Sequence, residues 1–132
     1  MKKNIKTYLV IFLALALSVT IAFAVISGSG AAVLNVNEVA PDPAAFTGVI
    51  TITGIVAGVS QQDPTIIGMM DKKELQCTST NCNKIYLPFK AANYSAVRGD
   101  EVRITGQFVA SMNAYLFMAE KVRVVKNHNI GG

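Results

Sequence analysis

Residues 49–59 read Val-Ile-Thr-Ile-Thr-Gly-Ile-Val-Ala-Gly-Val, and this stretch decides the fold of the chain. Val, Ile and Thr dominate it, and these residue types favour extended strands. Gly54 and Gly58 interrupt the run. Glycine inside a long strand typically marks a bulge or a sharp bend, which the corners of a closed barrel need. We therefore predict a bent strand over residues 49–59 as the first strand of a small β-barrel.

Four more strands are expected after this one, separated by residues that favour turns. They span residues 65–71, 84–89, 101–109 and 114–125. Alternation of side chains along two of them indicates strands with two distinct faces. The strand at 84–89 has Ile85, Leu87 and Phe89 on one face and Lys84, Tyr86 and Pro88 on the other. The strand at 101–109 has Val102, Ile104 and Phe108 inward and Glu101, Arg103, Thr105 and Gln107 outward.

The order of these elements predicts the fold class. Residues 91–97, between the third and fourth strands, are expected to form a short helix or an irregular loop, and five strands with such a connector are the element order of an OB-fold barrel. An immunoglobulin-type sandwich would need about seven strands. A short helical element is expected before the barrel, with Asp42 as its cap, Pro43 at its first position and Gly48 at its exit. We predict an all-β, five-stranded OB-fold-like barrel with a short helix.

Composition narrows the class of protein. The chain has 132 residues, of which 52% are hydrophobic and 15% charged, and this apolar fraction excludes a disordered chain. Most of the formal net charge of +4 comes from Lys2, Lys3 and Lys6, so that the predicted barrel is close to neutral. A neutral barrel argues against a nucleic-acid partner.

The N-terminal segment predicts the location of the barrel. Residues 8–26 contain no charged residue and follow three lysines, which is typical of a single membrane-spanning helix with the lysines on the cytoplasmic side. We expect residues 1–26 to anchor the chain in a bacterial inner membrane with its domain facing the periplasm. The alternative is a signal peptide cleaved near Ala24. Residues 27–35 are expected to be a flexible leash, residues 36–126 the OB-fold-like domain and residues 127–132 a C-terminal tail.

The two cysteines, Cys77 and Cys82, lie in a polar loop between the second and third predicted strands. In an oxidising, exported compartment such a pair is most simply a structural disulfide. A redox-active dithiol or a metal site is the alternative reading, although thioredoxin-like motifs have two intervening residues and this pair has four.

Two stretches resemble exported bacterial OB-fold domains. The first covers residues 36–39, 42–48 and 49–56, and the second covers residues 99–106 and 119–122. In layout the chain is similar to the membrane-anchored periplasmic haem chaperones of cytochrome c maturation, which carry a haem-binding His after the last strand. The resemblance implies haem as a possible ligand, with His128 and Tyr86 near the ligand surface. The family has a Tyr shortly after its His, and no Tyr follows His128 here.

No sequence motif indicates an enzyme. The chain has no Gly-x-Ser-x-Gly, no P-loop and no dinucleotide fingerprint. His128 is its single histidine, so a structural zinc site would lack a fourth Cys or His ligand. We expect a membrane-tethered periplasmic binding module that handles haem in cytochrome c maturation. The alternative is a structural or assembly adaptor that binds another protein of the cell envelope.

Overall fold

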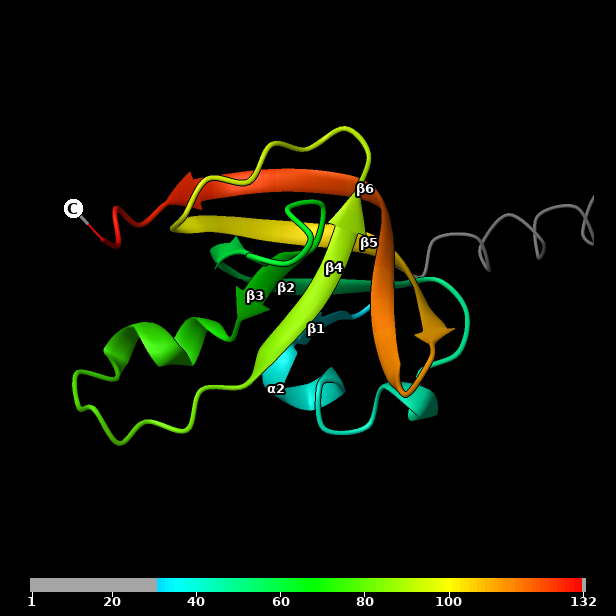
Figure 1. The fold of residues 1–132 in the computed structure, drawn as a ribbon, viewed down its shortest axis with the longest axis horizontal. Helices are drawn as coiled ribbons and strands as arrows, with labels where there is room; N and C mark the ends of the chain where they lie inside the picture. The colour runs from blue at the N-terminus through cyan, green and yellow to red at the C-terminus, as the bar shows by residue number, and fades with distance from the viewer. Residues whose placement is uncertain (1–30, 132) are drawn as a thin grey trace, which may run out of the picture. The chain divides into compact units, whose positions relative to one another are not determined.

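The computed structural model describes residues 31–131, whose strands close into a barrel (Figure 1). The five predicted barrel strands are all present, with bounds that differ by a few residues from the expected ones. In chain order the elements are β1 (Val33–Asn35), α2 (Val36–Val39), the 3-10 helix η1 (Pro43–Ala45), β2 (Ile50–Val59), β3 (Ile67–Met70), the 3-10 helix η2 (Lys72–Gln76), β4 (Tyr86–Ala91), β5 (Asp100–Ser111) and β6 (Ala114–Asn127).

Strand β2 closes the barrel because both of its edges are used. One edge pairs antiparallel with β5 over residues 50–55, and the other pairs antiparallel with β3 over residues 55–59. The remaining pairings are β3 with β4, β4 with β6 and β6 with β5, so that β2, β3, β4, β6 and β5 form a ring. A closed ring leaves no free edge among these five strands, which is how small barrels avoid edge-to-edge association.

The interior is filled by the inward side chains of these strands. Leu87 and Phe89 of β4 are buried as the alternation predicted, whereas Ile85 is 41% exposed because β4 begins one residue later. Phe117 of β6 packs edge-on against Phe108, with ring centroids 5.1 Å apart. The other fully buried apolar side chains are Val36, Val39, Ile52, Ile55, Val56, Met69, Val102 and Ile104.

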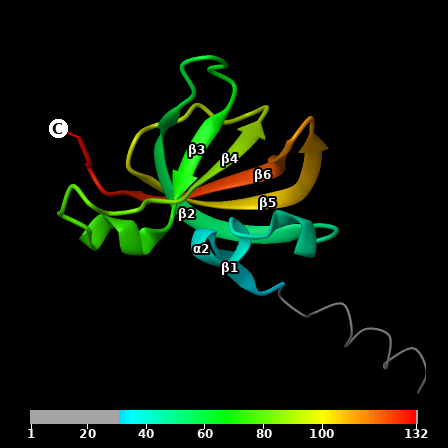
Figure 2. The same cartoon turned by 60° about the horizontal axis from the view of Figure 1, so that its bottom comes forward.

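The first elements of the described residues are β1 and α2, which lie together beside β2 (Figure 2). Strand β1 pairs in parallel with residues 51–53 of β2, on the edge that β3 leaves free. This strand falls inside residues 27–35, which the sequence predicts as a leash, since three residues are too few for an alternation to show. Helix α2 places Val36 and Val39 in the core.

The connector between β4 and β5 is an irregular loop rather than a helix. Its Tyr94 ring stacks on Phe89 at 6.4 Å and packs on the core. The short helical element expected near Pro43 is present as η1, with Gly48 after it in the left-handed region. No helix within residues 31–131 is both long and apolar enough to cross a membrane. The predicted anchor at residues 8–26 and the cleavage site at Ala24 lie outside the described residues.

The long β5–β6 hairpin makes a tight contact at Gly106. The register between the two strands shifts next to this residue, and a side-chain carbon at Gly106 would overlap the backbone carbonyl of Met118. At the far end of the hairpin, the side chain of Met112 is fully exposed in the turn.

Replacing Gly106 by Ala should therefore destabilise the barrel. The added methyl group must push β5 away from β6, and we expect Gly106→Ala to lower the free energy of unfolding by about 2 kcal/mol or more. Gly68→Ala is the matched control, because a methyl group there meets only the Gly58 carbonyl oxygen at an ordinary 3.8 Å. Chemical denaturation of the full chain measures both. Equal stability of the two variants would contradict the close approach at Gly106.

Candidate functional site

The outer surface of β2, β3 and β4 carries a hollow floored by small residues. Gly58 of β2 pairs with Gly68 of β3, and Gly68 pairs with Pro88 of β4, so these three residues form a row across the strands. With no long side chain in the row, a hollow of about 540 Å³ opens above it. Its remaining lining residues are Ala57, Val59, Ser60, Ile66 and Tyr86. We call it the glycine-lined hollow.

Tyr86 stands at the boundary between this hollow and a second one. It is the first residue of β4, and its side chain is 53% exposed because its neighbour Leu87 takes the inward position. The second hollow, of about 250 Å³, is lined by Ala57, Met70, Glu74, Leu75, Cys77, Lys84, Tyr86, Arg98 and Ile130. We call it the basic hollow. The two hollows with Tyr86 between them are the candidate face.

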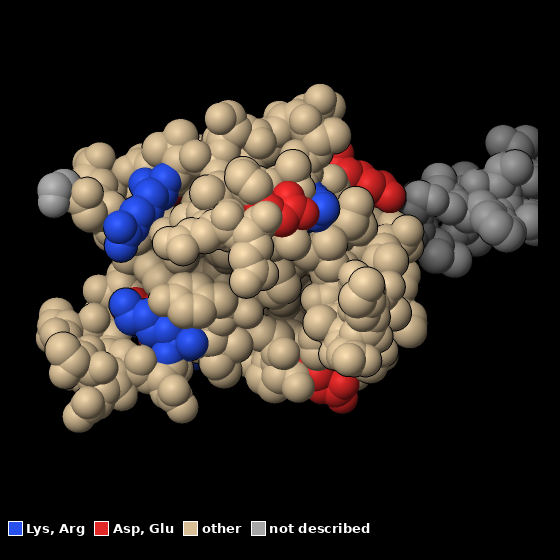
Figure 3. Space-filling view, in the orientation of Figure 1, with Lys and Arg blue, Asp and Glu red and all other residues tan. Residues whose placement is uncertain are grey.

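The Lys and Arg side chains of the described residues differ in their pairing. Lys90 of β4 forms an ion pair with Asp63 at 2.9 Å. The Asp63 pKa is lowered to about 2, because the Thr65 hydroxyl and then Lys90 donate hydrogen bonds to its carboxylate. Among residues 31–131, neither Lys84 nor Arg98 has a carboxylate within 4.0 Å. Most of the Lys and Arg surface visible in Figure 3 lies at the end of the molecule where β6 and the C-terminus are found.

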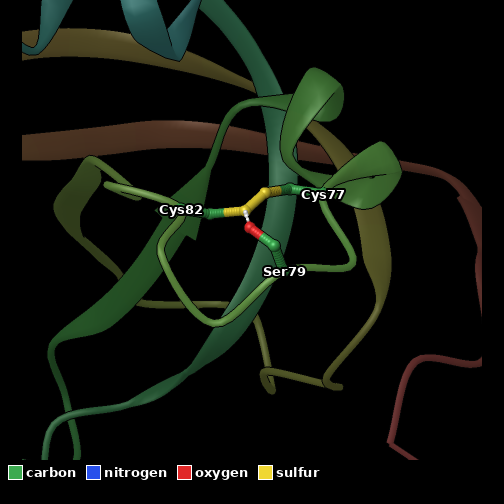
Figure 4. The surroundings of a disulfide bond; sticks show 3 residues. All are labelled: Cys77, Ser79 and Cys82. Atoms are coloured by element: carbon green, nitrogen blue, oxygen red, sulfur yellow. Dashed lines mark hydrogen bonds between the residues drawn. A yellow bond between two sulfur atoms is a disulfide. The ribbon is translucent and has the colours of Figure 1, made fainter.

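The predicted disulfide is present and borders the basic hollow. Cys77 and Cys82 are bonded with their Cα atoms 6.4 Å apart, a separation ordinary for disulfides. Figure 4 shows Ser79 turned toward this bond, with its Oγ atom 3.4 Å from the Cys82 sulfur. The bond holds the segment between η2 and β4 in a closed loop. A redox role for the pair stays a prediction.

His128 lies at another position, packed on the turn before β5. Its backbone N–H donates to the Gly99 carbonyl at 2.9 Å, and its Nε2 atom lies 2.7 Å from the Glu101 carboxylate. The side chain is only 18% exposed. The tail that the sequence places at residues 127–132 is thus tied to the barrel over its first residues, and β6 extends to Asn127.

The structure corrects the outward position predicted for the Glu101 side chain. Alternation places it outward, but its side chain is only 8% exposed. Lys72 of η2 and His128 cover it from two distant parts of the chain, and Lys72 Nζ lies 2.9 Å from its carboxylate. The hydrogen bond from Lys72, then the contact with His128, lowers the pKa of Glu101 against the opposing effect of burial. Burial by side chains from distant parts of the chain does not appear as a periodic pattern in the sequence.

The two predicted ligand residues do not share one hollow. Tyr86 borders both hollows, whereas His128 lines neither of the hollows described above. Ile130, two residues after His128, does line the basic hollow. Arg98 also lines the basic hollow, and no motif in the sequence singled it out as a site residue. Its neighbour Gly99 in the left-handed region does complete a turn, closed by the Asp100 N–H to the Val97 carbonyl.

A closed five-stranded barrel with this strand order has the architecture of an OB-fold-like protein. The hypothetical protein YgiW from E. coli, an OB-fold-like bacterial protein, has a similar solved structure. The two share 12% sequence identity at a TM-score of 0.50, over 71% of this chain and 90% of YgiW. At this identity the similarity concerns the fold alone. The sequence matches no protein-family model and no curated protein.

The Glu101 contacts predict a stability that depends on pH. Because the folded-state pKa lies below the ordinary value of 4.5, the stabilisation is complete above that pH and is lost as the pH falls through the folded-state value. We expect Glu101→Gln to cost about 1–2 kcal/mol at pH 7 and progressively less in acid. Urea unfolding of the full chain across this pH range measures the effect.

The control is Glu120→Gln on the exposed side of β6, which should change stability by less than about 0.5 kcal/mol at every pH. A cost of Glu101→Gln that is the same at pH 3 and pH 7 would show that the carboxylate charge plays no part.

Proposed function

We propose that this protein is a non-enzymatic binding module that takes its ligand on the candidate face. The observation that carries the proposal is the half-exposed Tyr86 ring between two hollows of ligand size. Aromatic rings with one apolar and one wet side are favoured at binding surfaces because they bury much area at little entropic cost. OB-fold barrels use the second and third barrel strands, here β3 and β4, for ligands.

The shape of the glycine-lined hollow supports an extended, flat ligand. Gly58 and Gly68 let a ligand approach the backbone of β2 and β3 closely, and Pro88 offers an apolar surface without a competing N–H. Such a floor suits a sugar ring, a planar group or a peptide segment stacked beside Tyr86. When the ligand is a peptide segment of another envelope protein, this protein acts as an adaptor for that partner.

The location is part of the proposal. The disulfide supports an oxidising compartment, and the charge pattern of residues 1–26 supports export with the domain held at the periplasmic side of the inner membrane. A tethered module of this kind acts by holding a ligand or partner near the membrane, which needs no catalytic group.

Haem handling is the more specific hypothesis, and it requires a rearrangement at His128. A His that ligates haem iron does so through a ring nitrogen, and the Nε2 atom of His128 is engaged by Glu101. Haem ligation through this atom therefore requires His128 to leave the Glu101 carboxylate. The hypothesis stays a prediction, with His128 as its test residue.

The general proposal predicts that Tyr86→Ala strongly weakens ligand binding while the fold persists. A panel of probes is titrated into the full chain and followed by amide NMR spectra: a tetramer of N-acetylglucosamine, a short unstructured peptide, haem and single-stranded DNA. At least one probe should shift the residues of the candidate face and lose about tenfold or more in affinity in Tyr86→Ala.

The matched control is Tyr115→Ala, because Tyr115 of β6 is also a strand tyrosine, 40% exposed, and lines neither hollow of the candidate face. For haem, the Soret band is compared between the native chain and His128→Ala. The proposal is contradicted if no probe shifts the candidate face, or if binding survives Tyr86→Ala and fails in Tyr115→Ala. A Soret band indifferent to His128→Ala would remove the haem hypothesis alone.

A further inference from the structure

We propose that the basic hollow binds the oxyanion of a ligand, a carboxylate or a phosphate, whose planar or apolar part lies against Tyr86. This inference rests on the proposed function, because it assumes that the candidate face is the binding face. It adds the chemical class of the ligand: an anion with an apolar body rather than a neutral sugar or a cation.

The charges that line the basic hollow carry the inference. Lys84 and Arg98 both line it, and Glu74 is the only acid among those of residues 31–131 that line it, so this lining has a net positive charge. Lys72 and Lys90, by contrast, are neutralised by Glu101 and Asp63. Lys84 and Arg98 line the same hollow, and neither has a carboxylate of residues 31–131 within 4.0 Å, which favours an anionic ligand. The planar guanidinium of Arg can hold either a carboxylate or a phosphate with two parallel hydrogen bonds.

The disulfide loop positions Lys84. The backbone N–H of Lys84 donates to the Cys82 carbonyl at 3.0 Å, and Cys82 is bonded to Cys77, which itself lines the hollow. The covalent loop therefore limits how far the base of the Lys84 side chain can move. A site held in place before binding loses less entropy when the ligand arrives.

The C-terminal residues position Arg98 from the opposite side. A side-chain carbon at Gly131 would lie 3.1–3.3 Å from the Arg98 guanidinium, so this backbone lies directly against the Arg98 side chain. Ile130 packs near Gly99 and lines the hollow. This segment is held by the contact of His128 with Glu101. His128 is thus a positioning residue for the basic hollow, acting through the backbone that follows it.

Tyr86 connects the anion site to the rest of the candidate face. It lines both hollows, so a ligand that places its charge beside Lys84 and Arg98 extends its body over the ring toward Pro88 and Gly68. The lining of the glycine-lined hollow contains no charged residue. The candidate face is therefore charged at one end and neutral at the other, which matches an amphipathic anion.

The test compares aromatic probes with and without a negative charge. Benzoate, phenyl phosphate and the neutral isostere benzamide are each titrated into the full chain and followed by amide NMR spectra. We expect saturable shifts of residues lining the basic hollow with the two anions, weakened by added salt, and much weaker shifts with benzamide. The ratio of benzoate to phenyl phosphate affinity tells which oxyanion the site prefers.

Variants identify the groups responsible. Lys84→Met and Arg98→Met keep the apolar stems, and each should weaken benzoate binding by about fivefold. Lys121→Met is the matched control on the exposed side of β6 and should bind as the native chain does. Each variant's own spectrum reports whether its fold is intact.

The outcomes separate this inference from the proposed function. If benzamide binds as well as benzoate at the same residues, or if both charge variants bind benzoate unchanged, the anion site is overturned while the candidate face stands as a binding face. If neither anion shifts the basic hollow, the anion site is overturned, and the probe panel with Tyr86→Ala then decides the proposed function independently.

Discussion

The divided pairing of β2 is the constraint on which the rest of the molecule depends. Residues 50–55 of this strand pair with β5, residues 55–59 pair with β3, and β1 occupies the remaining length of the second edge. Where β2 changes its pairing partner from β5 to β3, a side-chain carbon at Gly54 would come within 2.7 Å of both Met69 and Met70. The sheet can therefore bend around this point and close on itself. Closure fixes the positions of β3 and β4, on whose outer side the glycine-lined hollow lies.

Closure also explains how residues from distant parts of the chain reach the candidate face. The β4 strand delivers Tyr86, the loop before it delivers Lys84, and the turn before β5 delivers Arg98. Two tethers hold this arrangement at its sides: the Cys77–Cys82 disulfide and the contact of His128 with Glu101. Neither tether lies in the core, yet each fixes one wall of the basic hollow. The His128–Glu101 contact, which stabilises the fold, therefore also shapes the basic hollow.

The sequence predicts those features that depend on local periodicity. Alternation around Leu87 correctly placed Tyr86 on the outer surface, and the glycines of residues 49–59 correctly indicated a bent barrel strand. The single pair of cysteines in a polar loop of a chain expected to be exported indicated the disulfide. Features that depend on tertiary contact could not be predicted in this way. The burial of Glu101 comes from its contacts with Lys72 and His128, and the position of Arg98 depends on its contact with the backbone at Gly131.

The position of the methionines has a chemical consequence. Met112 at the tip of the β5–β6 hairpin is fully exposed, whereas Met69 is fully buried in the barrel and Met70 is 5% exposed. Peroxide oxidises a thioether to its sulfoxide in proportion to its access to solvent. Met112 is therefore oxidised in the native state without damage to the core, while Met69 reacts only when the barrel opens. The ratio of the two sulfoxides formed under peroxide therefore records how often the barrel opens.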